Sequence, residues 1–372
     1  MKIEQIDLLH LRMPLRSPFE TSFGRSINRD CLLIVVKADG LEGYGECVAD
    51  WEPGYSSETV GTEWHILKEF ILPCVVDAEI DHPQALRDKV KWIRGHRMAK
   101  AGLEMALWDL FGKLRGQSLK KLLGGQRDRV EVGVSVGLQE SPEKLVEVVE
   151  GYLQQGYRRV KLKIKPGRDI ADVQAVRQAF PTLRLQVDAN SAYTLENAYT
   201  LKPLDELNLL LIEQPLDEED LWDHHLLQRN FKTPICLDES ILSLQHARQA
   251  LEMGSCRIIN IKAGRVGGLS EAVAIHDHCL SKGVAVWCGG MLETGVGRAS
   301  NLALASLPGF TLPGDISATD RYYDEDITQE CFVLNPDSTI DVPEKTGLGV
   351  TLNRQALKKY QLDAFSSRNL VK

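Results

Sequence analysis

The stretch LRLQVDAN at residues 183–190 is a short apolar run that ends in an acid, and similar runs recur along the chain. A longer segment with helical periodicity follows each run, for example residues 141–155, 195–207 and 269–281. Eight runs at a pitch of roughly 25 residues predict a closed parallel barrel, because a doubly wound open sheet usually has about six strands. The runs are Val130–Val136, Arg159–Ile164, Leu183–Val187, Leu209–Ile212, Ile235–Leu237, Arg257–Ile261, Val284–Trp287 and Phe310–Leu312.

The residues before and after the barrel have a different pattern. Residues 1–50 alternate apolar and polar positions in the runs Ile3–Leu11, Cys31–Val36 and Gly43–Val48, and Asp39-Gly40 is a hairpin-turn signal. Residues 57–114 then change to a helical period. We therefore expect an α+β domain over 1–125 and the barrel over 126–320, with its last helix missing or displaced. In the final segment, 321–372, the strand-like pieces 331–334 and 350–352 are expected to return to the first domain.

Composition excludes several classes of function. The net charge is −8 and no polybasic run is present, so neither nucleic acid nor an anionic membrane surface is an expected partner. No apolar stretch approaches the ~20 residues that span a bilayer. The eight cysteines include no C-x-x-C pair, and Met1 is not followed by a signal-like segment, so we expect a cytoplasmic protein with reduced thiols.

Three consecutive runs end in an acid, namely Asp188, Glu213 and Asp238, which are 25 residues apart each time. In a parallel barrel the reactive face lies at the carboxyl ends of the strands, so the three carboxylates should share one sector of the mouth. Each acid alone could simply cap the following helix. Three together would repel one another unless a cation held them. Oxygen ligands with no nearby cysteine or histidine favour Mg²⁺ first and Mn²⁺ second, and disfavour zinc.

Lysines flank these acids in the predicted ring. Lys161 and Lys163 lie two residues apart, on the inward side of the second run, and Lys262 ends the sixth run. Runs two and six are opposite in a ring of eight, so a substrate held on the metal would have one lysine at each face. Burial beside another cation lowers the pKa of an amine, which allows it to act as a base near neutral pH.

Together these motifs resemble the enolase superfamily, muconate-lactonising subgroup, which carries Lys-x-Lys on strand two, metal acids on strands three to five and Lys on strand six. The resemblance covers almost the whole chain and implies a (β/α)7β barrel with an N-terminal α+β capping domain that the C-terminal segment completes. More narrowly, WCGGMLETG at 287–295 resembles the seventh-strand loop of the o-succinylbenzoate synthase family, whose members also racemise N-acylamino acids. SPFETSFG at 17–24 and EPGYS at 52–56 are similar to that family's two capping loops.

The resemblance implies a role for each matching residue. Lys163 and Lys262 are the implied acid–base pair, with the acids Asp188, Glu213 and Asp238 as Mg²⁺ ligands. Lys161, Asn190, Glu239 and Arg265 support them. Substrate would be bound by Phe19, Phe23, Tyr55, Ser135, Gly289, Gly290 and Met291. The plainer alternatives are that the aromatic residues pack in the core of the first domain, that the glycines start a helix and that Arg265 is a surface charge.

The implied activity is dehydration of 2-succinyl-6-hydroxy-2,4-cyclohexadiene-1-carboxylate to o-succinylbenzoate, a step of menaquinone biosynthesis, together with racemisation of N-succinyl or other N-acyl amino acids. A dipeptide epimerase or a muconate-type cycloisomerase is the alternative within the superfamily. An epimerase should carry an Asp-x-Asp motif near the eighth strand, where this chain has only Asp315. A non-enzymatic binding module should have lost one of the five core residues, which are the two acid–base lysines and the three metal-binding acids, and none is lost. We expect a homo-oligomer that acts on a small carboxylate.

Overall fold

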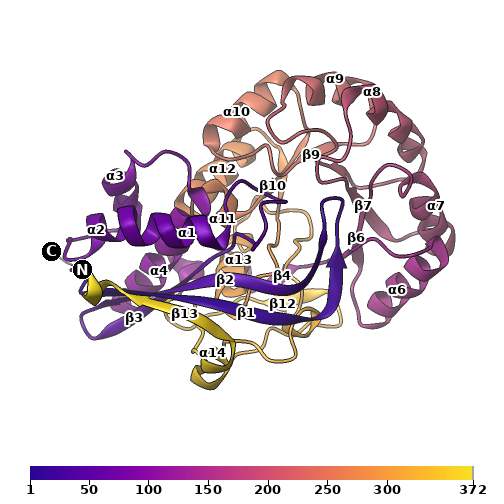
Figure 1. Cartoon of the computed structure of the whole chain (residues 1–372). Coiled ribbons are helices and arrows are strands. Elements are labelled where there is room, and N and C mark those ends of the chain that lie inside the picture. The colour runs from indigo at the N-terminus through magenta and orange to yellow at the C-terminus, as the bar shows by residue number, and fades with distance from the viewer. Residues whose placement is uncertain (371–372) are drawn as a thin grey trace.

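The computed structural model describes residues 1–370, which form an antiparallel α+β domain and a parallel barrel (Figure 1). The first domain contains a four-stranded sheet in the order β13-β1-β2-β3. Asp39 and Gly40 both have positive φ values, 52° and 73°, as the predicted hairpin between β2 and β3 requires. The strands are β1 (Gln5–Glu20), β2 (Arg25–Ala38), β3 (Leu41–Cys47) and β13 (Gln361–Ser366).

The C-terminal segment does return to this sheet, but by a different piece from the one predicted. β13 pairs with β1, whereas residues 331–334 and 350–352 form no strand and instead bury Phe332 and Leu352 in the main core. Apolar alternation alone could not separate these cases, because a buried irregular segment shows the same pattern as a short strand.

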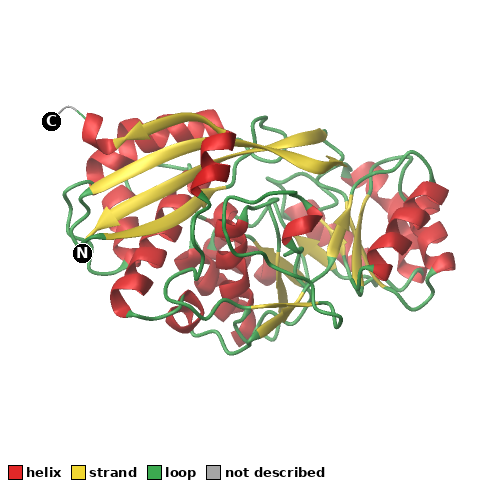
Figure 2. Ribbon diagram, turned by 90° about the horizontal axis from the view of Figure 1, so that it is seen from below, coloured by secondary structure: helices red, strands yellow, loops and turns green. Residues whose placement is uncertain are grey.

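Helices cover one face of the first sheet (Figure 2). The long helix α4 packs directly on β3, where Gly45 allows close contact, since a Cβ there would lie 2.0 Å from the Gly102 carbonyl oxygen. The helical segments are α1 (Val60–Ile66), the π-helix η1 (Leu67–Ile71), α2 (Leu72–Val75), the 3₁₀ helix η2 (Pro83–Ala85), α3 (Leu86–Val90), α4 (Arg97–Arg115) and α5 (Leu119–Leu123).

The second domain is a parallel sheet of seven strands that runs in sequence order from β5 to β11, with helices in an arc outside it (Figure 1). Its strands are β5 (Val134–Val136), β6 (Arg159–Lys163), β7 (Arg184–Asp188), β8 (Ile212–Glu213), β9 (Ile235–Leu237), β10 (Ile258–Ile261) and β11 (Ala285–Cys288). Its helices are α6 (Pro142–Gln154), α7 (Ile170–Ala179), α8 (Leu195–Ala198), α9 (Trp222–Asn230), α10 (Leu244–Met253), α11 (Ala263–Val266), α12 (Leu269–Ser281) and α13 (Gly295–Ala305).

The eighth run closes the barrel without forming a regular strand. Leu312 N–H donates to Val286 O at 3.4 Å on one side, and Gly133 N–H donates to Gly314 O at 2.8 Å on the other. A short 3₁₀ helix, η4 (Thr319–Arg321), follows in place of an eighth barrel helix. The predicted (β/α)7β architecture with its added α+β domain is therefore confirmed.

Two local predictions hold only in part. The first run is split, because β4 (Arg129–Glu131) pairs antiparallel with β12 (Thr339–Asp341) and only β5 joins the barrel. The predicted helix at 195–207 is α8 followed by a 3₁₀ helix, η3 (Tyr199–Glu206), which contains Pro203. The chain ends with α14 (Arg354–Tyr360), β13 and the 3₁₀ helix η5 (Ser367–Asn369).

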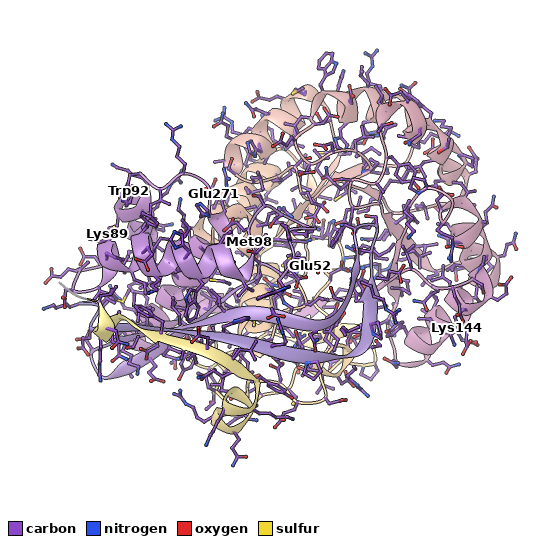
Figure 3. All side chains as sticks on the ribbon, viewed as in Figure 1. Glu52, Lys89, Trp92, Met98, Lys144 and Glu271 are labelled. Carbon is purple, nitrogen blue, oxygen red and sulfur yellow. The ribbon has the colours of Figure 1, made fainter. Side chains whose placement is uncertain are left out.

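The two domains contact each other at several places. Arg87 of α3 donates to Glu271 of α12 at 3.3 Å, and Figure 3 shows Glu271 on the side of the barrel that faces the first domain. The β1–β2 hairpin reaches over the barrel, where Leu138 N–H donates to Glu20 O at 3.0 Å. The loop after β3 also reaches the barrel, where Lys262 Nζ donates to the Tyr55 hydroxyl at 2.9 Å, so this loop and the hairpin lie above the carboxyl ends of the barrel strands. Among residues 1–370, no helix combines the length and the apolar character needed to cross a membrane.

Candidate active site

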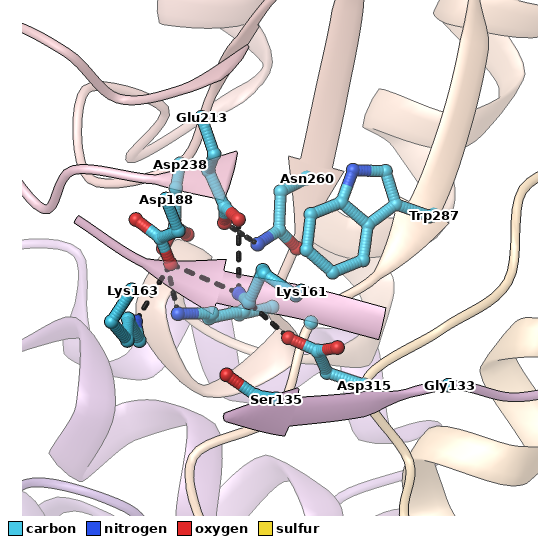
Figure 4. A network of polar contacts seen from close by, with 12 residues as sticks. Gly133, Ser135, Lys161, Lys163, Asp188, Glu213, Asp238, Asn260, Trp287 and Asp315 are labelled. Atoms are coloured by element: carbon cyan, nitrogen blue, oxygen red, sulfur yellow. Dashed lines mark hydrogen bonds and ion pairs between the residues drawn. The ribbon is translucent and has the colours of Figure 1, made fainter. Parts of the chain in front are cut away.

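Lys161 of β6 lies at the centre of the strand ends (Figure 4). Its Nζ donates to Glu213 Oε2 at 2.9 Å and lies 3.0 Å from Asp188 Oδ2 and 2.6 Å from Asp315 Oδ2. Burial alone would lower the pKa of Lys161, but the three carboxylates outweigh it and raise the pKa. Lys161 is thus held as an ammonium ion and serves as a fixed positive charge.

Lys163 lies on the same face of β6 but in a less acidic setting. Its Nζ donates to Asp188 Oδ2 at 2.7 Å and to Asn190 Oδ1 at 2.6 Å. Burial lowers the pKa of Lys163 and the charge of Lys161 adds to this effect, while Asp188 opposes it. Of the two lysines on this strand, Lys163 is therefore the better placed to lose its proton.

Asn190 connects Lys163 to Glu239, since its Nδ2 donates to Glu239 Oε1 at 2.7 Å. Asn190 itself has a positive φ of 44°, which asparagine tolerates better than most residues. Glu239 is buried, and burial raises its pKa to about 7. The predicted supporting residues Lys161, Asn190 and Glu239 thus lie in one network with Lys163.

Lys262 follows β10 and lies in a second network. Its Nζ donates to Asp238 Oδ2 at 2.7 Å and to the Tyr55 hydroxyl at 2.9 Å, and Arg265 donates to the other oxygen of Asp238. Burial would lower the pKa of Lys262, but nearby negative groups raise it. Arg265 is 2% exposed, so it is not a surface charge. Tyr55 is more than part of an apolar lid, because its hydroxyl takes part in this polar network.

The three predicted metal ligands lie at neighbouring strand ends, but each of them is bound to a cationic side chain. Within residues 1–370, no three Asp, Glu, His or Cys side chains gather in a group that could hold a metal ion. The sequence predicted that the three carboxylates meet at one point. They do not meet while lysines are paired with them. Their donor chemistry still fits a hard cation, because the set is buried and consists only of oxygen, and the nearby Glu239 Oε2 is buried without a partner among the described residues.

One cavity connects the two lysine networks. Both Lys163 and Lys262 line it, and Ser135 adds a buried hydroxyl that has no hydrogen-bond partner among the described residues. Phe23 is 44% exposed at the mouth. Of the predicted substrate-binding residues, the cavity is lined by Phe19, Phe23, Tyr55, Ser135, Gly290 and Met291. Gly289 lies beside it, where a Cβ would approach Lys262 Cε to 2.6 Å.

Sequence reasoning missed two groups that the structure adds to the site. Asp315 lies three residues after the eighth run and binds Lys161 and Arg159, the latter at 2.6 Å. The strand-end rule that found the other acids could have found it if the rule had extended a few residues past each run. Asn260 donates to Glu213 Oε1 at 2.7 Å and faces inward two residues before Lys262. Two-residue alternation on the sixth run could have identified this side chain.

Comparisons with known proteins identify the family of the chain. Residues 3–124 match the mandelate racemase / muconate lactonizing enzyme N-terminal domain, and residues 144–356 match the enolase C-terminal domain-like family. The chain is 51% identical to an o-succinylbenzoate synthase of Geobacillus kaustophilus over 97% of this chain and 96% of that protein. It is 49% identical to an N-succinylamino acid racemase of Thermus thermophilus over 97% of this chain and 98% of that one.

Solved structures give the same result at the level of the fold. A crystal structure of an enolase superfamily member from Listeria innocua superposes with a TM-score of 0.94 at 45% identity, covering 98% of this chain and 99% of that chain. The chain therefore belongs to the enolase superfamily and, within it, to the mandelate racemase / muconate lactonizing enzyme family.

Proposed function

We propose that this enzyme forms o-succinylbenzoate by dehydration and also racemises N-succinylamino acids, the two activities named for its relatives. The observation that carries the proposal is the pair of buried lysines, Lys163 and Lys262, which line one cavity from separate parts of the barrel. Racemisation needs a proton donor and a proton acceptor on opposite faces of one carbon, and dehydration next to a carboxylate needs one base. The same pair of lysines suits both reactions.

Mg²⁺, with Mn²⁺ as a substitute, is the cation that Asp188, Glu213 and Asp238 would hold, and enolase superfamily members use Mg²⁺. When bound, such an ion binds the substrate carboxylate and stabilises the negative charge that develops when the α-proton leaves. Lys161 and Lys262 form ion pairs with Glu213 and Asp238, so these lysines would have to share the carboxylates with the ion.

The residues of the chain perform the proton transfers. Lys163 Nζ removes the α-proton, and Lys161 stays charged and attracts the carboxylate of the substrate. In racemisation Lys262 Nζ delivers a proton to the opposite face. In dehydration Lys163 returns its proton to the departing hydroxyl group, while Lys262 contributes only its positive charge. Phe19 and Phe23 cover the cavity and exclude water from the charged intermediate.

One observation makes a dipeptide epimerase the less favoured candidate. Such an enzyme needs free carboxylates near the eighth strand to bind the ammonium group of its substrate. Asp315, the one acid there, is already paired with Lys161 and Arg159, and Ser317 occupies the second position. No comparable observation separates a muconate-type cycloisomerase from the proposed enzyme, so the assay described below decides between them.

The cytoplasmic location, the homo-oligomer and the domain limits at 125 and 320 remain predictions.

A parallel assay tests the proposal. The purified protein with added Mg²⁺ is given the cyclohexadiene precursor, the two enantiomers of an N-succinylamino acid, a dipeptide and a muconate. We expect turnover of the first two classes and little of the others. Turnover of the dipeptide or of muconate alone would contradict the proposal, as would full activity in excess chelator.

A further inference from the structure

Glu46 is a buried carboxylate of the α+β domain that reaches into the barrel. It lies near the end of β3 and is 1% exposed. Its Oε2 accepts hydrogen bonds from Thr294 Oγ1 at 2.7 Å, Thr294 N at 3.1 Å and Gly297 N at 3.0 Å. These donors form the start of α13, where unpaired N–H groups favour a negative charge. Glu46 therefore caps a barrel helix from the other domain.

The start of α13 is shaped to admit this carboxylate. A Cβ at Gly297 would lie 2.8 Å from Glu46 Oε2 and 2.7 Å from Glu293 Cγ, so a larger residue would push both side chains away. Burying a carboxylate is costly unless several donors replace the lost water. The glycine and the helix start supply the room and the donors that make this burial tolerable.

The loop that ends at Thr294 provides one wall of the cavity, through Gly290, Met291 and Leu292. Glu293 holds this loop from within the barrel, since its Oε2 accepts from Met291 N at 2.9 Å and its Oε1 accepts from Asn301 Nδ2 at 2.8 Å. The loop is thus fixed by two carboxylates, Glu293 from its own domain and Glu46 from the other.

Glu46 also lies beside the segment that leads to Tyr55. Burial raises the pKa of Glu46, and the fully buried Arg29, whose positive charge opposes this shift, donates to Val48 O at 2.6 Å and to Ala49 O at 3.2 Å. A small apolar cluster joins this segment to the barrel loop and consists of Val48, Ala49 and Met98 with Tyr55 and Met291 packed against them.

We infer that Glu46 is a positioning residue that places the Met291 wall of the cavity and so sets which side chains the site accepts. Glu46 does not line the cavity and acts through Thr294 and the loop before it. The inference rests on the proposed function, because it assigns specificity to that site. A looser wall should weaken the binding of substrates whose side chains contact it and should leave the proton transfers intact.

The test compares Glu46→Gln with Glu42→Gln. Glu42 lies on the same face of the same strand, but it binds Arg354 of α14 and has no contact with the barrel loop. For a series of N-succinylamino acids with side chains of increasing size, Glu46→Gln should change the ratio of KM values between small and large substrates by about tenfold, with kcat altered less. Glu46→Asp should restore part of this selectivity, and Glu42→Gln should leave it as in the original protein.

Hydrogen–deuterium exchange provides a readout that is independent of turnover. Glu46→Gln should speed exchange in a peptide covering 289–298 and leave the strands β6 to β10 protected. An unchanged KM ratio with unchanged exchange in this peptide would overturn the inference. So would a uniform loss of activity on all substrates with faster exchange throughout, which is the result of a purely structural role. If the original protein turns over none of these substrates, the proposed function fails, and the exchange measurement alone decides whether Glu46 holds the loop.

Discussion

Two lysines that lie two residues apart on one strand have opposite pKa shifts, because their carboxylate partners differ in number. Lys161 faces three carboxylates, whereas Lys163 shares one of them with an uncharged amide. Sequence alternation could predict that both lysines point inward, but it could not assign this difference, because Asp315 arrives from 154 residues further along the chain. Contacts of that kind appear only when the barrel closes.

The roles of Lys163 and Lys262 are separable by solvent-deuterium exchange. With either enantiomer of an N-succinylamino acid in D₂O, Lys163→Ala and Lys262→Ala should each exchange the α-proton only from the enantiomer that faces the remaining lysine. Racemisation should be lost in both variants, since it needs a proton transfer on each face. Dehydration should be lost in Lys163→Ala, while Lys262→Arg retains part of it through its charge. Exchange of both enantiomers by one of the alanine variants would refute the two-face arrangement.

Removal of one carboxylate should affect metal affinity and rate together. Asp188→Asn, Glu213→Gln and Asp238→Asn each remove one negative charge from the proposed ligand set, and we expect kcat to fall on the order of 10²–10³. The Mg²⁺ concentration needed for half-maximal activity should rise in the same variants, as measured by metal titration after chelation. Asp172→Asn, a buried acid of α7 that binds Arg168, is the control that should leave the metal titration unchanged.

Among the helices and strands, the sequence predicted the elements that belong to a repeating pattern and missed those that do not. The strand ends of the barrel and the Asp39-Gly40 hairpin have local signals, and the structure confirms the fold built from them. The first run breaks into β4 and β5 because β4 pairs with β12, a strand more than 200 residues later in the chain. No local pattern indicates such a partner, and the same holds for β13.

The contact of the β1–β2 hairpin with the barrel depends on one glycine. A Cβ at Gly137 would lie 2.8 Å from the Glu20 carbonyl oxygen, a backbone atom that cannot move alone, so Gly137→Ala should displace the hairpin that carries Phe19 and Phe23. We expect KM to rise by about tenfold and the free energy of unfolding to fall by about 1–3 kcal/mol, as in other overpacked sites. Gly151→Ala in α6 has open space around it and should slightly increase stability without a change in KM. An unchanged KM in Gly137→Ala would show that the hairpin does not cover the substrate.

For the whole molecule, the site is complete only when two domains meet. The barrel supplies the lysines and carboxylates, which the sequence places by counting strands, whereas Tyr55 and the hairpin come from the other domain and were predicted from the resemblance alone. The hydrogen bond from Lys262 to Tyr55 and the bonds from Thr294 to Glu46 cross between the domains. Neither could be predicted from periodicity, because the way two domains dock leaves no repeating pattern in either sequence.

The contact of Glu46 with the barrel should make stability depend on pH in a defined direction. Burial raises the pKa of Glu46 from 4.5 to about 7, although Arg29 opposes this effect. Between these values the folded state binds more protons than the unfolded state, so the contribution of Glu46 to stability falls as the pH rises and levels off above the folded pKa. The other titratable groups that interact electrostatically with Glu46 are Glu293, Cys31, Cys47, Glu63 and Tyr323.

Glu46→Gln does not titrate, so the difference in unfolding free energy between the variant and the original protein isolates this effect. We expect that difference to shift in favour of the variant between about pH 4.5 and pH 7, by on the order of 3 kcal/mol, and to stay constant above pH 7. Denaturant unfolding of both proteins across this range, with Glu42→Gln as the control, measures it. A variant that is equally destabilised at every pH would show that Glu46 is ionised throughout. A shift in the expected direction would instead mean that the fold retains an unfavourable buried charge at neutral pH. A residue that positions the loop at a cost in stability would show this behaviour.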